Sequence, residues 1–359
     1  MEKNQQHYPL LDWMQQGAFR VENGIITYVN SAAACYLFRA GMEISELIPF
    51  GKEDYEEYAG GCLYLSLKLH DTLFGATVVR MDGADVFILD TPQEDRYLQV
   101  LSLAAMELRS PLAGMISTAD HLLPLATADA SPEVRKYAAQ LNQRLMQMQR
   151  IISNMSDCAV CSQADQRNME LVEIVSTLEE QLCRAAQALQ HTGIRLEYRL
   201  PKERIFTLVY TQRLERAVYN LISNAAKFSP ADSMIEVQLI RRGNRLALSV
   251  MDTGCGIRDK GDIFTRYLRQ AGLEDYRNGI GLGMVFVRST ALLHGGAVLV
   301  DSPEDVGTRV TMTMAITQRK DTDVHTPILR IDYAGERDHC LLELSDVLPN
   351  ELYTTDKVN

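Results

Sequence analysis

Residues 220–228 read NLISNAAKF. The polar residues Asn220, Asn224 and Lys227 recur at spacings of four and three, so a helix would carry all three on one face. Amide oxygens are hard ligands suited to Mg²⁺, which bridges phosphate groups, and a lysine ammonium neutralises phosphate charge. An ordinary amphipathic helix with a polar face has the same pattern. The stretch therefore becomes informative only together with its neighbours.

Two glycine-containing stretches follow it. Residues 252–257 read DTGCGI after a strand-like run, where the Asp252 carboxylate can accept a hydrogen bond from an exocyclic amine such as that of adenine. Glycines let the backbone approach a flat ring closely. Residues 279–283 read GIGLG before the helix-like run 284–293, and the free amides of a helix N-terminus favour phosphate. No Gly-Lys-Ser/Thr follows, so this is not a P-loop. Taken singly, such turns often bind nothing.

In this order and spacing, the three stretches resemble the ATP-binding domain of histidine kinases and of the wider GHKL ATPases. The resemblance covers about residues 170–317 and implies ATP and Mg²⁺ as ligands. It implies that Asn220 and Asn224 hold Mg²⁺ and phosphates, that Asp252 recognises adenine, and that residues 258–278 form a lid. The implied ATP-binding residues are Asn220, Asn224, Lys227, Asp252, Gly254, Gly256, Phe264, Gly279, Gly281, Leu282, Gly283 and Thr308.

The same region alternates helix-like and strand-like segments, which favours a two-layer α/β sandwich. The helix-like segments are 171–190 and 212–228, and the strand-like segments are 194–200, 235–241, 246–250, 297–301 and 309–315.

Upstream, apolar residues recur at alternating spacings of three and four in two separate sets. The first set is Leu101, Ala105, Leu108, Leu112, Met115, Ala119 and Leu122, and the second is Ala138, Leu141, Leu145, Met148, Ile152, Met155 and Ala159. A polar break over residues 124–132 separates them. Two such helices form a hairpin whose core is most simply completed by dimerisation into a four-helix bundle. The alternative is a hairpin that packs within one chain on another domain.

Residues 105–112 read AMELRSPL and resemble the phosphoacceptor motif of the same family. In that family the residue before the glutamate is the histidine that attacks the γ-phosphate, and here it is Met106. If Ala105 lies in the seam, Met106 points away from it. A thioether cannot form a phosphoramidate, so Met106 is a degenerate acceptor. Glu107 and Arg109 match the motif, and the hydroxyl of Ser110 leaves a phosphatase-like role open.

The first ninety residues mix strand-like runs with turns, including a hairpin of 75–80 with 85–89. An asparagine after a strand opens a short helix at 31–38, an order that resembles a PAS sensor domain. A small α+β domain without a ligand is the alternative.

We therefore expect a multidomain α+β chain. Its parts are a PAS-like sensor at 1–92, a dimerisation hairpin at 93–165, an α/β-sandwich ATP-binding domain at 166–318 and an extension at 319–359. In the extension, runs 328–333 and 340–344 predict a second hairpin. The pair Cys158 and Cys161 has no second Cys-x-x-Cys to complete a zinc site, so small apolar packing is expected.

Composition narrows the class of partner. A net charge of −11 argues against nucleic acid. No apolar run approaches the roughly 20 residues of a membrane span, and no signal pattern opens the chain, so a cytoplasmic location is expected.

The main hypothesis is a two-component signalling protein of the histidine kinase family with a degenerate acceptor site. Its expected partners are a second copy or a related kinase, and a response regulator. One alternative is an ATP-responsive pseudokinase or scaffold that regulates a partner kinase, and another is a kinase that uses a different acceptor residue. A non-signalling GHKL ATPase is disfavoured, because hydrolytic relatives carry a glutamate base where this chain has Asn220.

Overall fold

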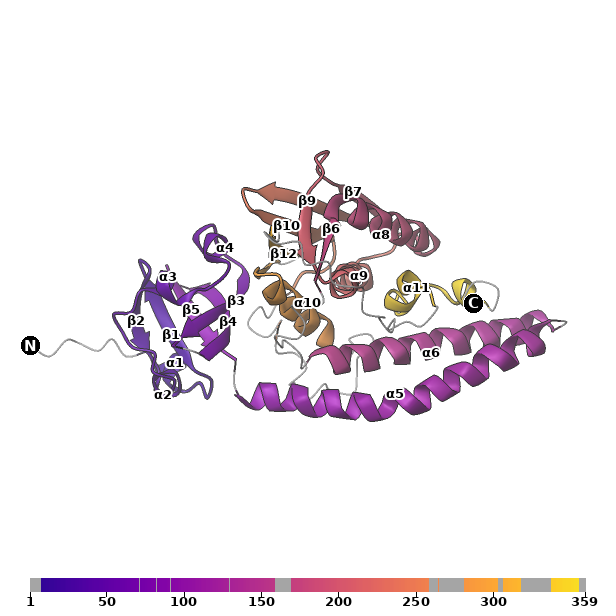
Figure 1. Cartoon of the computed structure of the whole chain (residues 1–359), viewed down its shortest axis with the longest axis horizontal. Coiled ribbons are helices and arrows are strands. Elements are labelled where there is room, and N and C mark those ends of the chain that lie inside the picture. Colours follow the sequence, from indigo (N-terminus) through magenta and orange to yellow (C-terminus); the bar gives the residue numbers. More distant parts are fainter. Residues whose placement is uncertain are drawn as a thin grey trace, which may run out of the picture.

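The computed structural model describes residues 8–70, 72–81, 83–90, 92–128, 130–158, 169–257, 264, 281–302, 306–317 and 337–354. An N-terminal domain lies at one end, and a long helical hairpin runs beside a domain built on a mixed sheet (Figure 1). The predicted mixed α+β architecture is confirmed. No helix within the described ranges is both long enough and apolar enough to span a bilayer.

The N-terminal domain is an antiparallel sheet in the order β2-β1-β5-β4-β3, with short helices between β2 and β3. Stacked rings of Phe19, Phe38 and Phe87 fill its core. Asn30 opens helix α2 by accepting a hydrogen bond from the Ala33 amide at 2.9 Å. The predicted hairpin is present as β4 and β5. The elements are α1 (Pro9–Asp12), β1 (Ala18–Glu22), β2 (Ile25–Val29), α2 (Ser31–Cys35), α3 (Ile44–Leu47), α4 (Lys52–Glu56), β3 (Cys62–Leu69), β4 (Thr72–Met81) and β5 (Ala84–Leu89).

The helical hairpin consists of α5 (Pro92–Thr127) and α6 (Pro132–Cys158). The predicted break between the helices is present but begins later than residue 124, because α5 continues through Pro124 to Thr127 and α6 begins at Pro132. Proline removes only one intrahelical hydrogen bond, and the helix tolerates that loss here.

Each apolar seam of the hairpin divides into two half-seams. One half is buried between the two helices, and the other half is exposed. The buried half-seams are Ala105, Leu112 and Ala119 on α5 with Ala138, Leu145 and Ile152 on α6, and the exposed half-seams are Leu108, Met115 and Leu122 on α5 with Leu141 and Met148 on α6.

The mixed-sheet domain, from β6 to β12, has a five-stranded sheet in the order β11-β12-β10-β9-β7. Inward residues alternate along β9 and β10, and helices α8, α9 and α10 contact these strands and their neighbours. This matches the expected two-layer arrangement. The predicted helix over 171–190 begins later, because residues 170–173 form β6, which pairs with β8 in a second, small sheet. The elements are β6 (Glu170–Glu173), α8 (Ile174–Leu189), η1 (Gln190–Thr192), β7 (Arg195–Arg199), β8 (Phe206–Val209), α9 (Thr211–Phe228), β9 (Met234–Arg242), β10 (Arg245–Met251), α10 (Leu282–Leu293), β11 (Val298–Asp301) and β12 (Arg309–Ala315).

The two sheets join edge to edge, because β3 of the N-terminal domain pairs with β11. The result is one ten-stranded sheet. The joint also has side-chain contacts. Tyr64 donates to Asp90 Oδ2 at 2.5 Å, and Arg288 of α10 lies 3.4 Å from the same oxygen.

The C-terminal segment, residues 337–354, contains α11 (His339–Glu343) and η4 (Asn350–Tyr353). The predicted strand at 340–344 is therefore wrong, and its partner run 328–333 lies outside the described residues. The Asp338 carboxylate accepts a hydrogen bond from the Leu341 amide at 2.9 Å and so caps a helix there.

Candidate functional site

The polar face of α9 lies against the start of α10. A Cβ placed on Gly283 would stand 3.0 Å from Asn220 Oδ1 and 3.8 Å from Asn224 Nδ2. Asn220 is buried, whereas Asn224 and Lys227 are half-buried. The structure thus brings together two of the three motifs predicted to act in one site. Glycine at 283 keeps the helix N-terminus close to both amides.

The third motif is held by backbone hydrogen bonds. Asp252 Oδ1 accepts from the Gly254 amide at 2.8 Å and from the Thr308 amide at 3.2 Å. Within the described residues Oδ2 accepts no hydrogen bond, so it is available to a ligand. Burial raises the pKa of the Asp252 carboxyl, and these two amides partly offset the rise. The carboxylate is therefore oriented before any ligand arrives.

Glycines make these close approaches sterically possible. A Cβ on Gly254 would lie 2.4 Å from the carbonyl oxygen of Phe228, at the end of α9. Gly307 has a φ of +112°, and a Cβ there would lie 2.0 Å from the Asp252 carbonyl oxygen. The Asp252 loop, the end of α9 and the turn before β12 are thus locked together.

The remaining predicted residues are only partly described. Gly281 precedes α10 with a φ of +81°, Leu282 is buried, and Gly256 has a φ of +72°. Gly279 and the predicted lid lie outside the described residues, apart from Phe264. The fully buried Phe264 ring lies 5.1 Å from the ring of Tyr64, so it contacts the N-terminal domain.

The described residues contain no group of three His, Cys, Asp or Glu side chains that would hold a metal ion. A Mg²⁺ ion bound here would depend on the amide oxygens of Asn220 and Asn224 and on phosphate oxygens. That donor set suits Mg²⁺, which binds few protein ligands and shares substrate phosphates.

Asn220 also has a partner that the sequence did not suggest. Arg150 of α6 donates from Nη2 to Asn220 Oδ1 at 3.3 Å and to Ser223 Oγ at 3.2 Å. The Asn220 amide nitrogen donates to the carbonyl oxygen of Arg216 at 2.8 Å. One predicted Mg²⁺ ligand thus lies at the junction between the hairpin and the mixed-sheet domain.

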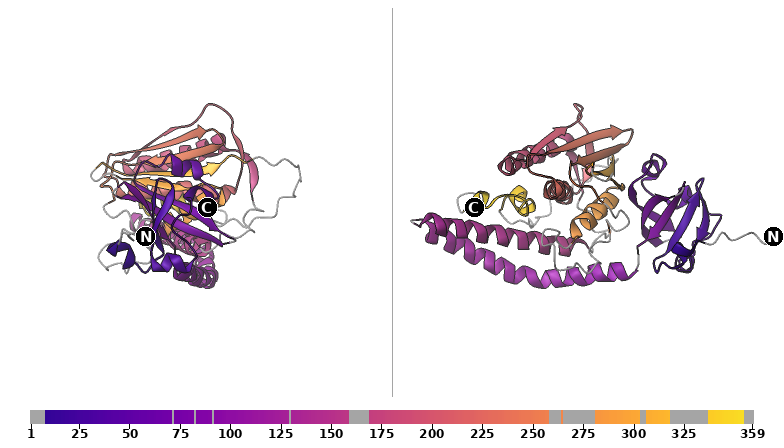
Figure 2. Two further views of the ribbon diagram at one scale, coloured as in Figure 1. Left: turned by 90° about the vertical axis from the view of Figure 1, so that its left-hand side faces the viewer. Right: turned by 180° about the vertical axis from the view of Figure 1, so that it is seen from behind.

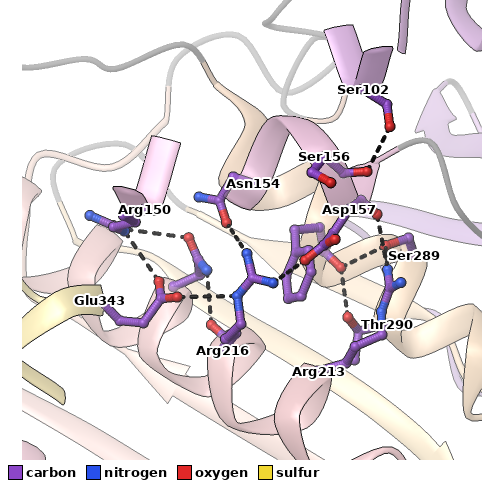
Figure 3. Close-up of polar contacts among 12 residues, drawn as sticks. Ser102, Arg150, Asn154, Ser156, Asp157, Arg213, Arg216, Ser289, Thr290 and Glu343 are labelled. Atoms are coloured by element: carbon purple, nitrogen blue, oxygen red, sulfur yellow. Dashed lines mark hydrogen bonds and ion pairs between the residues drawn. The ribbon is translucent and has the colours of Figure 1, made fainter. Parts of the chain in front are cut away.

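That junction is a polar network between α6 and α9 (Figure 3). Arg216 donates to Asn154 Oδ1 at 2.9 Å and pairs with Asp157, both near the end of α6. Arg213 donates to the Asp157 carbonyl oxygen at 3.3 Å and to Ser289 of α10 at 2.9 Å. Sequence reasoning missed this network. A signal was present, since residues 213, 216 and 220 follow the same spacing of three and four.

The acceptor motif lies on the exposed side of α5. Met106 is 57% exposed, beside the fully buried Ala105, as the seam predicted. Glu107, Arg109 and Ser110 are also exposed. Arg109 donates to Ser156 Oγ at 2.9 Å and lies 3.9 Å from Asp157, which links the motif to the junction. Of the Cys-x-x-Cys pair, Cys161 lies outside the described residues.

Comparison with known proteins agrees with this layout. Residues 209–318 match the family described as histidine kinase-, DNA gyrase B- and HSP90-like ATPase. The sensor-like histidine kinase SenX3 of Mycobacterium tuberculosis is 27% identical over 243 residues, which are 67% of this chain and 58% of SenX3. The chain is thus similar to sensor histidine kinases, and its residues 209–318 match the ATPase family that includes them.

Other histidine kinases match over similar stretches. The histidine protein kinase DivJ of Caulobacter vibrioides is 27% identical over 58% of this chain and 36% of DivJ. The structure of full-length ShkA in complex with AMPPNP covers 62% of this chain and 47% of ShkA, with 21% identity and a TM-score of 0.48. The chain thus spans little more than half the length of SenX3, and less of DivJ.

Proposed function

We propose that this chain is a two-component signalling protein that binds ATP–Mg²⁺ and responds to it without phosphorylating the usual acceptor position. The observation that carries the proposal is the position of Gly283 against Asn220 and Asn224, beside an Asp252 already held by two amides. These are the places where a nucleotide needs a phosphate cradle, hard oxygen ligands and an acceptor for the adenine amine.

Each residue then has a separate task. Asp252 Oδ2 accepts from the exocyclic amine of adenine, and Thr308 keeps that carboxylate in place. The amides at the start of α10 face the phosphates, together with the positive end of the helix dipole. Asn220 and Asn224 supply oxygen atoms to Mg²⁺, and Lys227 neutralises phosphate charge.

Met106 decides what the protein does with the nucleotide. A thioether offers no nitrogen lone pair for attack on a γ-phosphate. Glu107 and Arg109 surround the position but cannot replace the nucleophile. The proposed activity is therefore regulation through ATP binding, as a pseudokinase that pairs with a second copy or with a related kinase and acts on a response regulator.

The hairpin supplies the proposed dimer interface. Its exposed half-seams place Leu108, Met115 and Leu122 on α5 beside Leu141 and Met148 on α6. Water-exposed apolar stripes of this length are unfavourable in a monomer. A second hairpin would cover them as a four-helix bundle. The N-terminal strand order and the Asn30 cap support a PAS-like sensor.

Calorimetry with Mg²⁺ and AMPPNP tests the nucleotide site. The variant Asp252→Asn keeps an oxygen for the Gly254 and Thr308 amides but presents an NH₂ group at the Oδ2 position. We expect about tenfold or greater loss of affinity, since a buried donor of the ligand loses its partner. Asp301→Asn, an exposed change on β11, is the control. Unchanged affinity in Asp252→Asn would refute the adenine assignment.

A further inference from the structure

The C-terminal segment is an integral part of the folded structure. It lies between the hairpin and the mixed-sheet domain, as Figure 1 and the right-hand view of Figure 2 show. It contacts α6, α8 and α9. Its apolar side chains Leu342, Leu344 and Tyr353 are fully buried. Leu344 and Tyr353 are part of the hydrophobic core of the mixed-sheet domain, so the segment is packed into that domain.

Amide side chains of α6 bind the backbone of this segment. Gln143 donates to the carbonyl oxygens of Ser345 and Leu348 at 2.9 and 2.8 Å, and Gln147 donates to that of Ser345 at 2.8 Å. Asn142 donates to the carbonyl oxygen of Tyr353 at 3.1 Å. Buried amides that lose such partners pay a desolvation penalty, so this face of α6 fits the segment specifically.

A buried carboxylate joins the two domains through the segment (Figure 3). Glu343 is fully buried, and its Oε1 accepts from Arg216 of α9 at 3.2 Å. Its Oε2 lies 3.3 Å from Nε of Arg150 on α6, and Asp346 accepts from Arg150 at 2.7 Å. The buried guanidinium groups of both arginines thus depend on carboxylates from the segment.

The start of the segment is anchored in the same way. Arg337 pairs with Asp120 of α5 at 2.5 Å, and His339 lies 2.7 Å from a carboxylate oxygen of Glu215 on α9. The segment therefore bridges both helices of the hairpin to the helix that carries the predicted Mg²⁺ ligands.

These contacts have a consequence for Asn220. Arg150, held by Glu343 and Asp346, places its Nη2 at 3.3 Å from Asn220 Oδ1. A guanidinium and a Mg²⁺ ion cannot share that oxygen, since two cations so close repel each other. Arg150 must move away before Asn220 can serve as a metal ligand.

We propose that residues 337–354 form an intramolecular clamp that holds the mixed-sheet domain on α6 and keeps Asn220 on Arg150. A closed clamp then weakens the binding of nucleotide and Mg²⁺, and the binding of nucleotide and Mg²⁺ loosens the clamp by the same factor. The nucleotide half of this inference rests on the proposed function. The clamp itself rests only on the contacts of the segment.

The test uses the full chain and two variants. Glu343→Gln keeps the shape of the side chain but removes the buried charge, and Asp346→Asn removes a partly exposed partner of Arg150 with less risk to folding. Glu351→Gln, an exposed change in η4, is the control. Hydrogen exchange measured by mass spectrometry shows how well the backbone amides of the segment are protected. Calorimetry with Mg²⁺–AMPPNP measures the affinity of the nucleotide site.

In both clamp variants we expect exchange over residues 339–353 to become about tenfold faster. We expect affinity for Mg²⁺–AMPPNP to rise about fivefold or more, the lower end of coupling between two sites. In wild type, Mg²⁺–AMPPNP should itself speed exchange over 339–353.

Three results would overturn parts of this account separately. A segment that stays protected in both variants refutes the clamp. A loosened segment with unchanged or weaker affinity refutes the coupling and leaves the nucleotide site intact. No binding heat in any protein, with a loosened segment, refutes the proposed function and leaves only the structural clamp.

Discussion

In the hairpin the acceptor motif lies on an exposed helix surface, whereas in the mixed-sheet domain the nucleotide motifs are built into buried backbone contacts. Met106 is 57% exposed. Asp252, by contrast, accepts two backbone hydrogen bonds, and Gly307 and Gly254 fit where no side chain could. The residue at the acceptor position can therefore be exchanged at little cost to the stability of the fold. The nucleotide motifs cannot, because the domain depends on them for its stability.

The largest effect is expected from charged substitutions in the exposed half-seams of the hairpin, where the proposed dimer interface lies. Leu108→Asp with Leu141→Asp would put four carboxylates into the seam of a dimer, at a cost above about 10 kcal/mol in total. Light scattering should then report a monomer that keeps its helical circular dichroism.

The matched control is Leu145→Asp, at a side chain only 2% exposed within the hairpin. It should unfold the hairpin instead of only separating the subunits. A wild-type protein that is monomeric at micromolar concentration would contradict the bundle.

Gly307→Ala tests whether the stability of the mixed-sheet domain depends on the close backbone contacts around Asp252. The new Cβ would meet the Asp252 carbonyl oxygen at 2.0 Å, at a residue with a φ of +112°. We expect a loss of about 3 kcal/mol or more in the free energy of unfolding. Chemical denaturation measures it.

Gly243→Ala separates the effect of the positive φ from the effect of the close contact with the Asp252 carbonyl oxygen. Gly243 has a φ of +57°, but nothing lies within 4 Å of its Cβ position. The backbone penalty alone should cost about 1 kcal/mol. Equal losses in both variants would show that the close approach of Gly307 to the Asp252 loop is unimportant.

The stability of the mixed-sheet domain should also depend on pH through His294. Its Nε2 accepts from the Tyr210 amide at 3.1 Å, and its Nδ1 lies 2.7 Å from the Thr290 carbonyl oxygen, an arrangement that suits the neutral ring. Burial lowers the pKa of His294 to about 4. The unfolded chain binds the proton more readily, at a pKa of about 6.5.

Stability is therefore full above the unfolded pKa and is lost as pH falls from about 6.5 towards 4. Between pH 7 and pH 5 the loss should be about 2 kcal/mol. Urea titrations at the two pH values measure it. His294→Gln cannot gain the proton and should lose this part of the pH dependence, while the exposed His191→Gln should retain it. An equal slope in all three proteins would contradict the assignment.

Much of this arrangement was predictable because it is local. The spacing of Asn220 and Asn224 predicted their shared face on α9, and the seam containing Ala105 predicted that Met106 points outward. Both depend only on helix periodicity. The five strands of the larger sheet in the mixed-sheet domain were predictable from their alternating apolar residues, whereas β6 and β8 were not predicted.

The rest depends on contacts between distant parts of the chain. The pairing of β3 with β11 is made by backbone groups, which leave no side-chain signature. Arg150 meets Asn220 only because the hairpin folds back on α9. Residues 340–344 have an apolar run that suits a strand, but the Asp338 cap and the packing of α11 on α6 favour a helix there. Helix α5 passes through Pro124, and Leu123 before this proline packs on the core of the hairpin while Thr127 after it is buried.

Phosphorylation of Met106→His shows whether Met106 alone removes the phosphoacceptor from a site that is otherwise competent. Because the position is exposed, the exchange should change the free energy of unfolding by no more than about 0.5 kcal/mol, as an ordinary surface substitution does. Purified wild type and Met106→His are incubated with γ-labelled ATP and Mg²⁺, and retained label is tested for acid lability. We expect acid-labile label on Met106→His and none on wild type. Acid-labile label on wild type, or none on Met106→His despite nucleotide binding, would contradict this expectation.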